Sequence, residues 1–168
     1  GSNEINDIQQ ISYSSKGNAN DFGNLTRSHV FTSASGDATR GACLGGFTSP
    51  NNLFNTVDYI TYSSTGDASD FGDLQSARRG GSGPSSSTRM VHLGGNMSPN
   101  TVIDYFTTQT LGNASDFGDL AVAAKEMGYG NTSNSIKGFS MGGEGASDYI
   151  NNIQQITIST TGNSTDFG

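Results

Sequence analysis

A seven-residue segment that ends in Asp-Phe-Gly occurs four times along this chain of 168 residues. The copies are residues 17–23, 66–72, 112–118 and 162–168, and their Asp-Phe-Gly triplets begin 49, 46 and 50 residues apart. A period of about fifty residues indicates a chain built from similar structural units that stack on one another. A motif present in every unit is expected to belong to the scaffold rather than to a catalytic site.

The repeat predicts one domain over residues 1–168, with a half-repeat at 1–23 and full repeats at 24–72, 73–118 and 119–168. Each full repeat has short runs of β-branched and aromatic residues separated by Gly, Asn, Asp and Ser. This pattern predicts about four short antiparallel strands per repeat. Such a sheet buries neither face alone, so we expect successive sheets to pack face to face around an axis.

Two scaffold features recur within the repeats. A pair of glycines closes one strand of each full repeat, where we expect crowded backbone or a positive φ. The phenylalanine of each Asp-Phe-Gly is expected to pack between neighbouring sheets and to bury about 150–250 Å². The glycines are Gly45, Gly46, Gly94, Gly95, Gly142 and Gly143, and the phenylalanines are Phe22, Phe71, Phe117 and Phe167.

The composition of the chain limits the classes of partner that it is expected to bind. The net charge is −7 and no basic run occurs, which disfavours nucleic acid and anionic membranes as partners. No run approaches the roughly 18 apolar residues of a membrane span. Cys43 is the one cysteine, and no cluster of His, Cys and Asp has metal-ligand spacing. We therefore expect neither a metal nor another cofactor.

The order of these features resembles the Kelch repeat of β-propellers. That family has a strand ending in Gly-Gly, then a strand with a tyrosine, an aromatic residue, and an arginine early in each unit. Here Leu93-Gly94-Gly95, Tyr105, Phe117 and Arg78 stand at those places, with Phe where Kelch repeats usually carry Trp. The arginine position falls at His29 in the first full unit and at Lys125 or Glu126 in the third. The resemblance implies an all-β fold of four-stranded antiparallel propeller blades, about three and a half of them in this chain.

The stretch 104–120 is similar to Kelch-like repeats in structural and tail-fibre proteins of marine bacteriophages, cyanophages included. This resemblance implies a non-enzymatic protein of the virion surface, whose propeller displays variable loops that bind a host surface, with glycan as the expected ligand. Propellers have typically 4–8 blades. We therefore expect self-association, or neighbouring repeats of a longer array, to complete the ring, with other virion proteins as further partners.

Two sets of residues are candidates for binding. The first lies in the variable segments that follow each double glycine, because loops on a rigid scaffold commonly carry recognition. Its members are Phe47, Phe54, Asn96 and Tyr149. The second is a basic residue five positions before each double glycine, namely Arg40, Arg89 and Lys137. These could line a face for an acidic ligand, but inter-sheet pairing or solvation is the simpler interpretation.

Several alternatives remain open on the sequence alone. Three repeats also suit a three-fold β-trefoil or prism. The protein could be a structural spacer or assembly module of a virion with no ligand of its own. A carbohydrate-active propeller enzyme of the galactose-oxidase kind would need copper ligands around Cys43, and none is evident. Asp67, Asp70 and Asp73 could hold Ca²⁺, although Asp and Asn at such spacing commonly cap turns.

Overall fold

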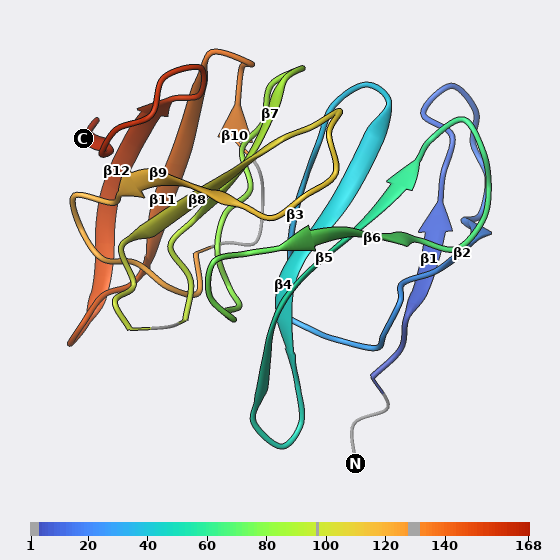
Figure 1. Ribbon diagram of the computed structural model, residues 1–168, viewed down its shortest axis with the longest axis horizontal. Helices are drawn as coiled ribbons and strands as arrows, with labels where there is room; N and C mark the ends of the chain where they lie inside the picture. The colour runs from blue at the N-terminus through green and yellow to red at the C-terminus, as the bar shows by residue number, and fades with distance from the viewer. Residues whose placement is uncertain (1–3, 97, 128–131) are drawn as a thin grey trace.

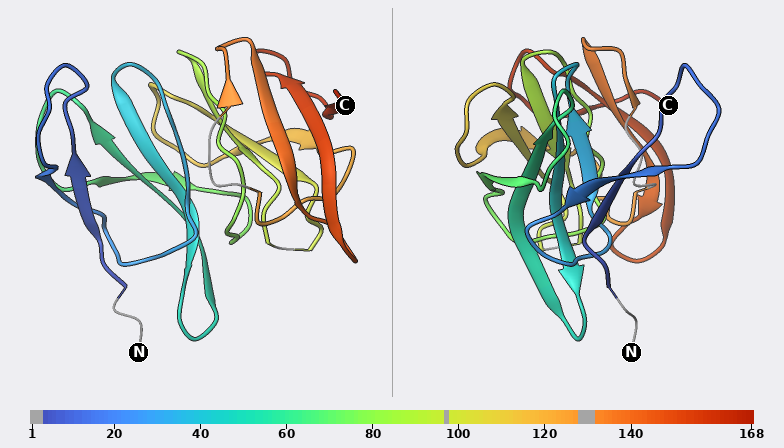
Figure 2. Two further views of the ribbon diagram at one scale, coloured as in Figure 1. Left: turned by 180° about the vertical axis from the view of Figure 1, so that it is seen from behind. Right: turned by 90° about the vertical axis from the view of Figure 1, so that its right-hand side faces the viewer.

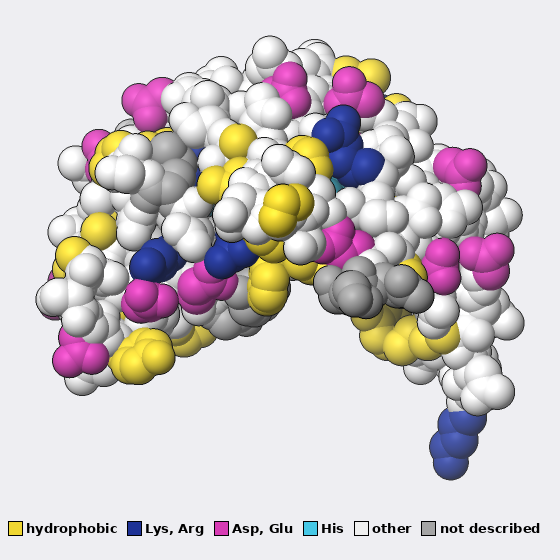
Figure 3. Space-filling model, turned by 90° about the horizontal axis from the view of Figure 1, so that it is seen from below, with side chains coloured by type: hydrophobic (Ala, Val, Ile, Leu, Met, Phe, Trp, Pro, Cys, Tyr) yellow, Lys and Arg dark blue, Asp and Glu magenta, His cyan; other side chains and the backbone are white. Residues whose placement is uncertain are grey.

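A computed structural model of the chain describes residues 4–96, 98–127 and 132–168, which form β-strands and no helix. The strands make four antiparallel sheets that lie side by side in a row (Figure 1). The first and fourth sheets lie at opposite ends of this row (Figure 2). The space-filling view shows that the row curves into an arc with a hollow on one side (Figure 3).

Within each sheet, strands that follow one another in sequence pair with one another. The first sheet contains β1 (Asp7–Gln10) and β2 (Asn20–Asn24). The second contains β3 (Ser33–Gly36), β4 (Arg40–Thr48), β5 (Asn52–Thr61) and β6 (Ser69–Asp73). The third contains β7 (Arg89–Leu93), β8 (Val102–Thr107) and β9 (Ser115–Asp119), and two bridges from Ser82 and Ser85 extend it beyond β7. The fourth contains β10 (Thr132–Ser133), β11 (Lys137–Glu144), β12 (Tyr149–Thr157) and β13 (Thr165–Asp166).

The double glycine ends a strand in only one of the three full repeats, so that expectation was partly wrong. β7 ends at Leu93, just before Gly94, but β4 and β11 continue through their glycine pairs. In both of these strands the register shifts at the pair, which forms a bulge. The six glycines have φ between +57° and +129°, a backbone conformation that other residues rarely adopt. In β4 and β11 the glycine pair therefore forms a bulge, and the strand pairing continues beyond it.

Two hydrophobic clusters fill the spaces between successive sheets. Between the second and third sheets lie Ala42, Leu44, Val57, Phe71, Leu74, Met90 and Phe106. Between the third and fourth lie Val91, Leu93, Ile103, Phe117, Leu120, Ala124, Met127, Ile156 and Ile158. The sheets are therefore held together mainly by apolar burial between their faces.

The phenylalanines of the repeated motif contribute directly to these contacts. Phe71 packs edge-on against Phe106 of the next sheet, with ring centroids 5.5 Å apart. Phe22, Phe71 and Phe117 are 6%, 2% and 2% exposed, whereas Phe167 is 59% exposed. The same residue type in the same motif is thus buried where another sheet follows and exposed at the fourth sheet.

Successive copies of the motif also hydrogen-bond to one another. The amides of Gly66, Gly112 and Gly162 each donate to the carbonyl of the phenylalanine one motif earlier, at 2.7–2.8 Å. Side chains at the next position, Asp67 and Asn113 among them, accept from the backbone amide of the residue that directly follows that earlier motif. Of the carboxylates considered for calcium, Asp67 and Asp70 therefore cap backbone amides in this structure.

Candidate functional site

The predicted loop residues lie mostly on strands, which corrects the expectation that they belong to loops. Phe47 is in β4, Phe54 is in β5 and Tyr149 begins β12, because β4, β5 and β12 extend well past the bulge. Asn96 lies between β7 and β8. The structure brings both Phe47 and Asn96 into contact with Arg79, a residue that the sequence analysis did not single out.

Arg79 is the centre of a half-buried cluster of aromatic and polar side chains. Its guanidinium carbon lies 4.9 Å from the ring centroid of Phe31 and 4.4 Å from that of Phe47. Its Nε also pairs with Oε1 of Glu126 at 3.3 Å. The amide side chain of Asn96 donates to the same carboxylate oxygen at 3.4 Å. We call Phe31, Phe47, Arg79, Asn96 and Glu126 the Arg79 cluster.

The Arg79 cluster is accessible from solvent and nearly neutral in charge. Phe31 is 46% exposed, and the side chains of Arg79 and Glu126 are 24% and 26% exposed. Phe31 has a φ of +59°, unusual for a bulky residue, and its carbonyl accepts from Gly80. An exposed ring beside fixed amide, guanidinium and carboxylate groups can stack on an apolar surface and hydrogen-bond to hydroxyls.

Phe54 and Tyr149 do not join this cluster through any contact that the described residues show. The ring of Phe54 lies 4.8 Å beneath the guanidinium of Arg27 and 6.3 Å from the ring of His29. Tyr149 is 84% exposed, and its amide donates to the carboxylate of Asp148. The four residues predicted from the variable segments therefore form no single site.

The recurrent basic residues tie sheets together. Arg40 donates to the carbonyl of Thr108 in the next sheet at 3.1 Å, and Arg89 donates to that of Ile158 at 3.0 Å. Each guanidinium also lies over a tyrosine ring of its own sheet. Lys137, in the fourth sheet, donates instead to the hydroxyl of Thr157. This set is structural wherever a following sheet is present.

A fully buried ionic group lies at the junction of the second and third sheets. Arg78 pairs with Asp104 at 2.9 Å, and both side chains are 0% exposed. The Nε of Arg78 also donates to Nδ1 of His92 at 3.2 Å. Burial raises the pKa of Asp104 and lowers those of Arg78 and His92, and the charge of Arg78 lowers the pKa of His92 further. His92 is therefore neutral at physiological pH.

The second sheet repeats this arrangement with different side chains. His29 and Cys43 occupy the places of Arg78 and His92, and the thiol lies 3.7 Å from Nε2 of His29. The structure thus gives Cys43 a histidine neighbour that the sequence analysis missed. Burial raises the pKa of the Cys43 thiol to about 11. A thiol that stays protonated at neutral pH is a weak nucleophile and a weak metal ligand.

In the third full unit the equivalent of Arg78 is Ala124, and not Lys125 or Glu126 as predicted. The carbonyls of Arg78 and Ala124 both accept from the second glycine of the preceding pair, and both residues follow a buried leucine by four positions. Ala124 is fully buried. The two extra residues follow this position, which explains the error.

A third recurrent polar position was missed altogether. Asp58, Asp104 and Gln154 lie at equivalent places on β5, β8 and β12, and each is at most 2% exposed. Each accepts from a backbone amide of the segment that leaves the preceding sheet, at 2.9–3.0 Å. The signal was present, because each directly follows Val or Ile and directly precedes Tyr or Gln in its strand. These side chains fix the connections between sheets.

Among the described residues, no group of three or more His, Cys, Asp or Glu side chains could hold a metal ion. Across that same part of the chain, no helix has the length and apolar character needed to cross a membrane.

Comparison with known proteins gives a likeness in fold. The solved structure of YjhT superposes on this chain with a TM-score of 0.69 and 12% sequence identity. The alignment covers 85% of this chain and 46% of that one, so this chain corresponds to just under half of YjhT. No protein-family model matches the sequence, and no curated protein matches it either.

Proposed function

We propose that the chain is a Kelch-like β-propeller segment, non-enzymatic, that binds carbohydrate on a host surface as part of a virion. The stacked antiparallel sheets, two of them four-stranded, and the likeness to YjhT support the propeller geometry. The virion setting comes from the resemblance of the repeats to phage structural and tail-fibre proteins. The Arg79 cluster is the observation that favours carbohydrate binding.

The chemistry of the Arg79 cluster suits a neutral sugar. The guanidinium of Arg79 is already paired with Glu126 and flanked by two aromatic rings, so it offers directed N–H groups rather than a free positive charge. The net charge of −7 also disfavours acidic glycans. A hexose could stack on the exposed ring of Phe31 and hydrogen-bond to Asn96 and Glu126. Weak single contacts of this kind gain strength when several copies act together.

Binding of the full chain to an array of neutral and acidic glycans tests this function. We expect neutral hexose or hexosamine ligands, and we expect Asn96→Ala to weaken binding at least about tenfold. Tyr149→Ala is the matched control, because Tyr149 is exposed and is not in the cluster. Binding to no glycan, or equal loss in both variants, would contradict the proposal.

A structural assembly module without a ligand is the second candidate. The observation that favours it is the exposure of Met141 and Phe167 on the fourth sheet, at 46% and 59%. Stable self-association of a chain that binds no glycan would support this candidate over the first.

A further inference from the structure

The contacts between successive sheets follow one rule. Each sheet presents a forward face to the next sheet and receives a contact from the preceding sheet on its rear face. At the two filled junctions, equivalent positions form the forward faces, and on the rear faces Phe106 and Ile156 are equivalent. The forward residues are Ala42, Leu44, Val57 and Phe71 in the second sheet, and Val91, Leu93, Ile103 and Phe117 in the third. The rear residues are Met90 and Phe106 in the third sheet, and Ile156 and Ile158 in the fourth.

The fourth sheet has a forward face of the same composition that nothing in the described chain covers. Its residues are those at positions equivalent to the forward residues of the third sheet, found by aligning the double glycines and the repeated motifs. They are Phe139, Met141, Ile153 and Phe167. Phe139 and Phe167 pack edge-on with ring centroids 5.3 Å apart. Met141 is 46% exposed, whereas its equivalents Leu44 and Leu93 are at most 1% exposed. An exposed apolar patch of this kind indicates an interaction surface.

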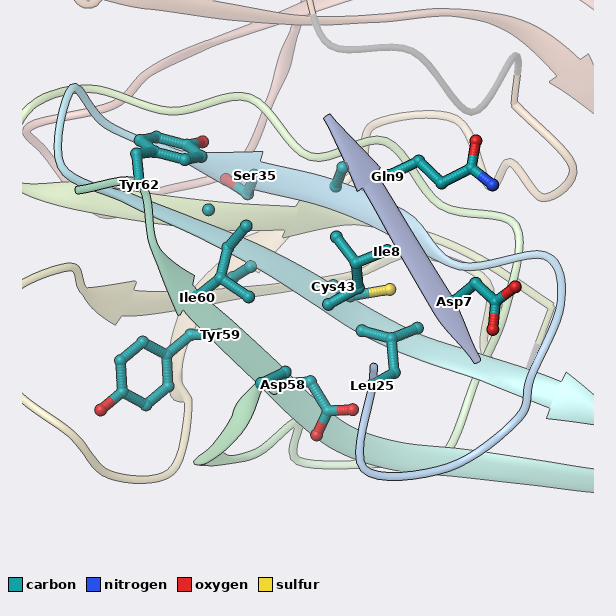
Figure 4. Close-up of a pocket in the computed structure, with 14 residues that line it drawn as sticks. Asp7, Ile8, Gln9, Leu25, Ser35, Cys43, Asp58, Tyr59, Ile60 and Tyr62 are labelled. Carbon is teal, nitrogen blue, oxygen red and sulfur yellow. The ribbon is translucent and has the colours of Figure 1, made fainter. Parts of the chain in front are cut away.

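The rear face of the second sheet is covered only in part. A groove of about 380 Å³ separates it from the first sheet, and Ala34, Gly41, Cys43, Ile60 and Tyr62 are among the residues that line it (Figure 4). The first sheet has only the strands β1 and β2, so it covers only part of this face.

Equivalent positions in the other sheets show that this groove is an unfilled junction. Ile60 is half-buried and Tyr62 is 50% exposed. Their equivalents are all at most 3% exposed, namely Phe106 and Thr108 in the third sheet and Ile156 and Ile158 in the fourth. The groove is therefore a sheet-to-sheet junction that the first sheet fills only in part.

We propose that the fourth sheet of one copy of this chain packs in this groove, on the second sheet of another copy. Its forward face would then cover Ile60 and Tyr62, as the third sheet's forward face covers Ile156 and Ile158. Arg40 and Arg89 each donate to a carbonyl of the following sheet. By the same rule, Lys137 donates to the carbonyl of Tyr62 in the second copy.

In this arrangement, the fourth sheet of one copy replaces the first sheet of the other copy. Residues 8–11 read Ile-Gln-Gln-Ile, as do residues 153–156, so β1 and β12 suit the same place on the second sheet. The fourth sheet carries this strand together with the strands β10 and β11, whose counterparts the first sheet lacks. It therefore buries more apolar surface at the same position. The contact is heterologous, and made twice it closes a ring of two chains.

Two observations favour a second copy as the occupant. The forward and rear faces are complementary because they reproduce a junction that the chain already makes between its own sheets. This chain also aligns with 46% of YjhT, so two copies in succession match the extent of that single chain. Each chain carries a charge of −7, so the association should strengthen as salt screens the repulsion.

Light scattering on the full chain with two single variants tests the proposal. Met141→Arg alters the forward face and Ala34→Arg alters the groove, and both wild-type side chains are exposed, so the fold should tolerate both changes. Leu111→Arg is the control, since Leu111 is 52% exposed in a turn outside both faces. Circular dichroism and melting confirm that each variant is folded.

We expect the wild type and the control to have twice the mass of the 17.4 kDa chain, and each face variant alone to have the mass of one chain. An equimolar mixture of the two face variants should recover a two-chain species, because each variant keeps the face that the other has lost. A wild type that stays monomeric up to about 1 mM, face variants that still associate, or a mixture that stays monomeric would overturn the proposal. The Arg79 cluster is unchanged in these variants, so glycan binding is scored separately.

Discussion

Replacing the same phenylalanine in two copies of the motif should have very different effects on stability. Phe71 is 2% exposed, and its ring lies 5.6 Å from that of Tyr59 and 5.5 Å from that of Phe106. Truncation of a ring buried in this way leaves a cavity and removes two edge-on contacts, so Phe71→Ala should lower the unfolding free energy by about 3–5 kcal/mol. Phe167 is 59% exposed and contacts one ring, so Phe167→Ala should cost under about 1 kcal/mol.

Urea unfolding followed by circular dichroism measures both values. The protein concentration must be low enough to keep the chain monomeric, because association would bury Phe167. Phe117→Ala serves as a second buried copy and should resemble Phe71→Ala, since Phe117 is also 2% exposed. Equal losses for Phe71→Ala and Phe167→Ala in the monomer would refute the view that this residue acts by packing against the next sheet.

Three further perturbations address other parts of the structure. Burial lowers the pKa of His29 and of His92, so the folded state binds protons less readily than the unfolded chain. The unfolding free energy should therefore fall as the pH drops below about 6.5, by up to about 1.4 kcal/mol per pH unit for each histidine. Urea titrations at two pH values measure this slope. A His29→Asn variant that keeps the full slope would contradict the assignment of the slope to the buried histidines. A Cβ at Gly72 would overlap the carbonyl oxygen of Gly112, whereas a Cβ at Gly112 meets nothing within 4 Å. Both glycines have similar positive φ, so backbone strain is common to both variants. Gly72→Ala should therefore lower the unfolding free energy by at least about 2 kcal/mol more than Gly112→Ala. Similar melting of the two variants would be inconsistent with the close approach of Gly72 to Gly112. Arg89→Met removes a 3.0 Å hydrogen bond to the fourth sheet and a stack over a tyrosine ring. Thermal unfolding should show that the unfolding free energy falls by about 1–2 kcal/mol. No change would mean that the contact is not formed in solution.

The stacking of all-β sheets could be predicted from the sequence because the signal is periodic. Each Asp-Phe-Gly stands at the same place relative to the strands around it, so Phe71 and Phe117 could be assigned to the spaces between sheets. The exposure of Phe167 could not be read from the motif, because the residue that covers such a ring belongs to another sheet.

The polar positions were harder to predict because their identity changes from repeat to repeat. Asp58, Asp104 and Gln154 share a hydrogen-bonding role but not a residue type. Phe47 and Asn96 of the Arg79 cluster were predicted as binding residues, but Phe31, Arg79 and Glu126 were missed for a different reason. Arg79 contacts Phe47, Asn96 and Glu126, which lie far from it in sequence, and only the tertiary fold brings them together.

Amide hydrogen exchange at three glycines tests most directly whether one repeated junction holds this molecule together. Gly66, Gly112 and Gly162 follow turns, yet each amide donates to the phenylalanine carbonyl of the preceding motif. We predict that all three exchange slowly, near the rate set by global unfolding, whereas the equivalent Gly17 exchanges rapidly. Rapid exchange at all four glycines would show that successive motifs are not joined, and would contradict the account.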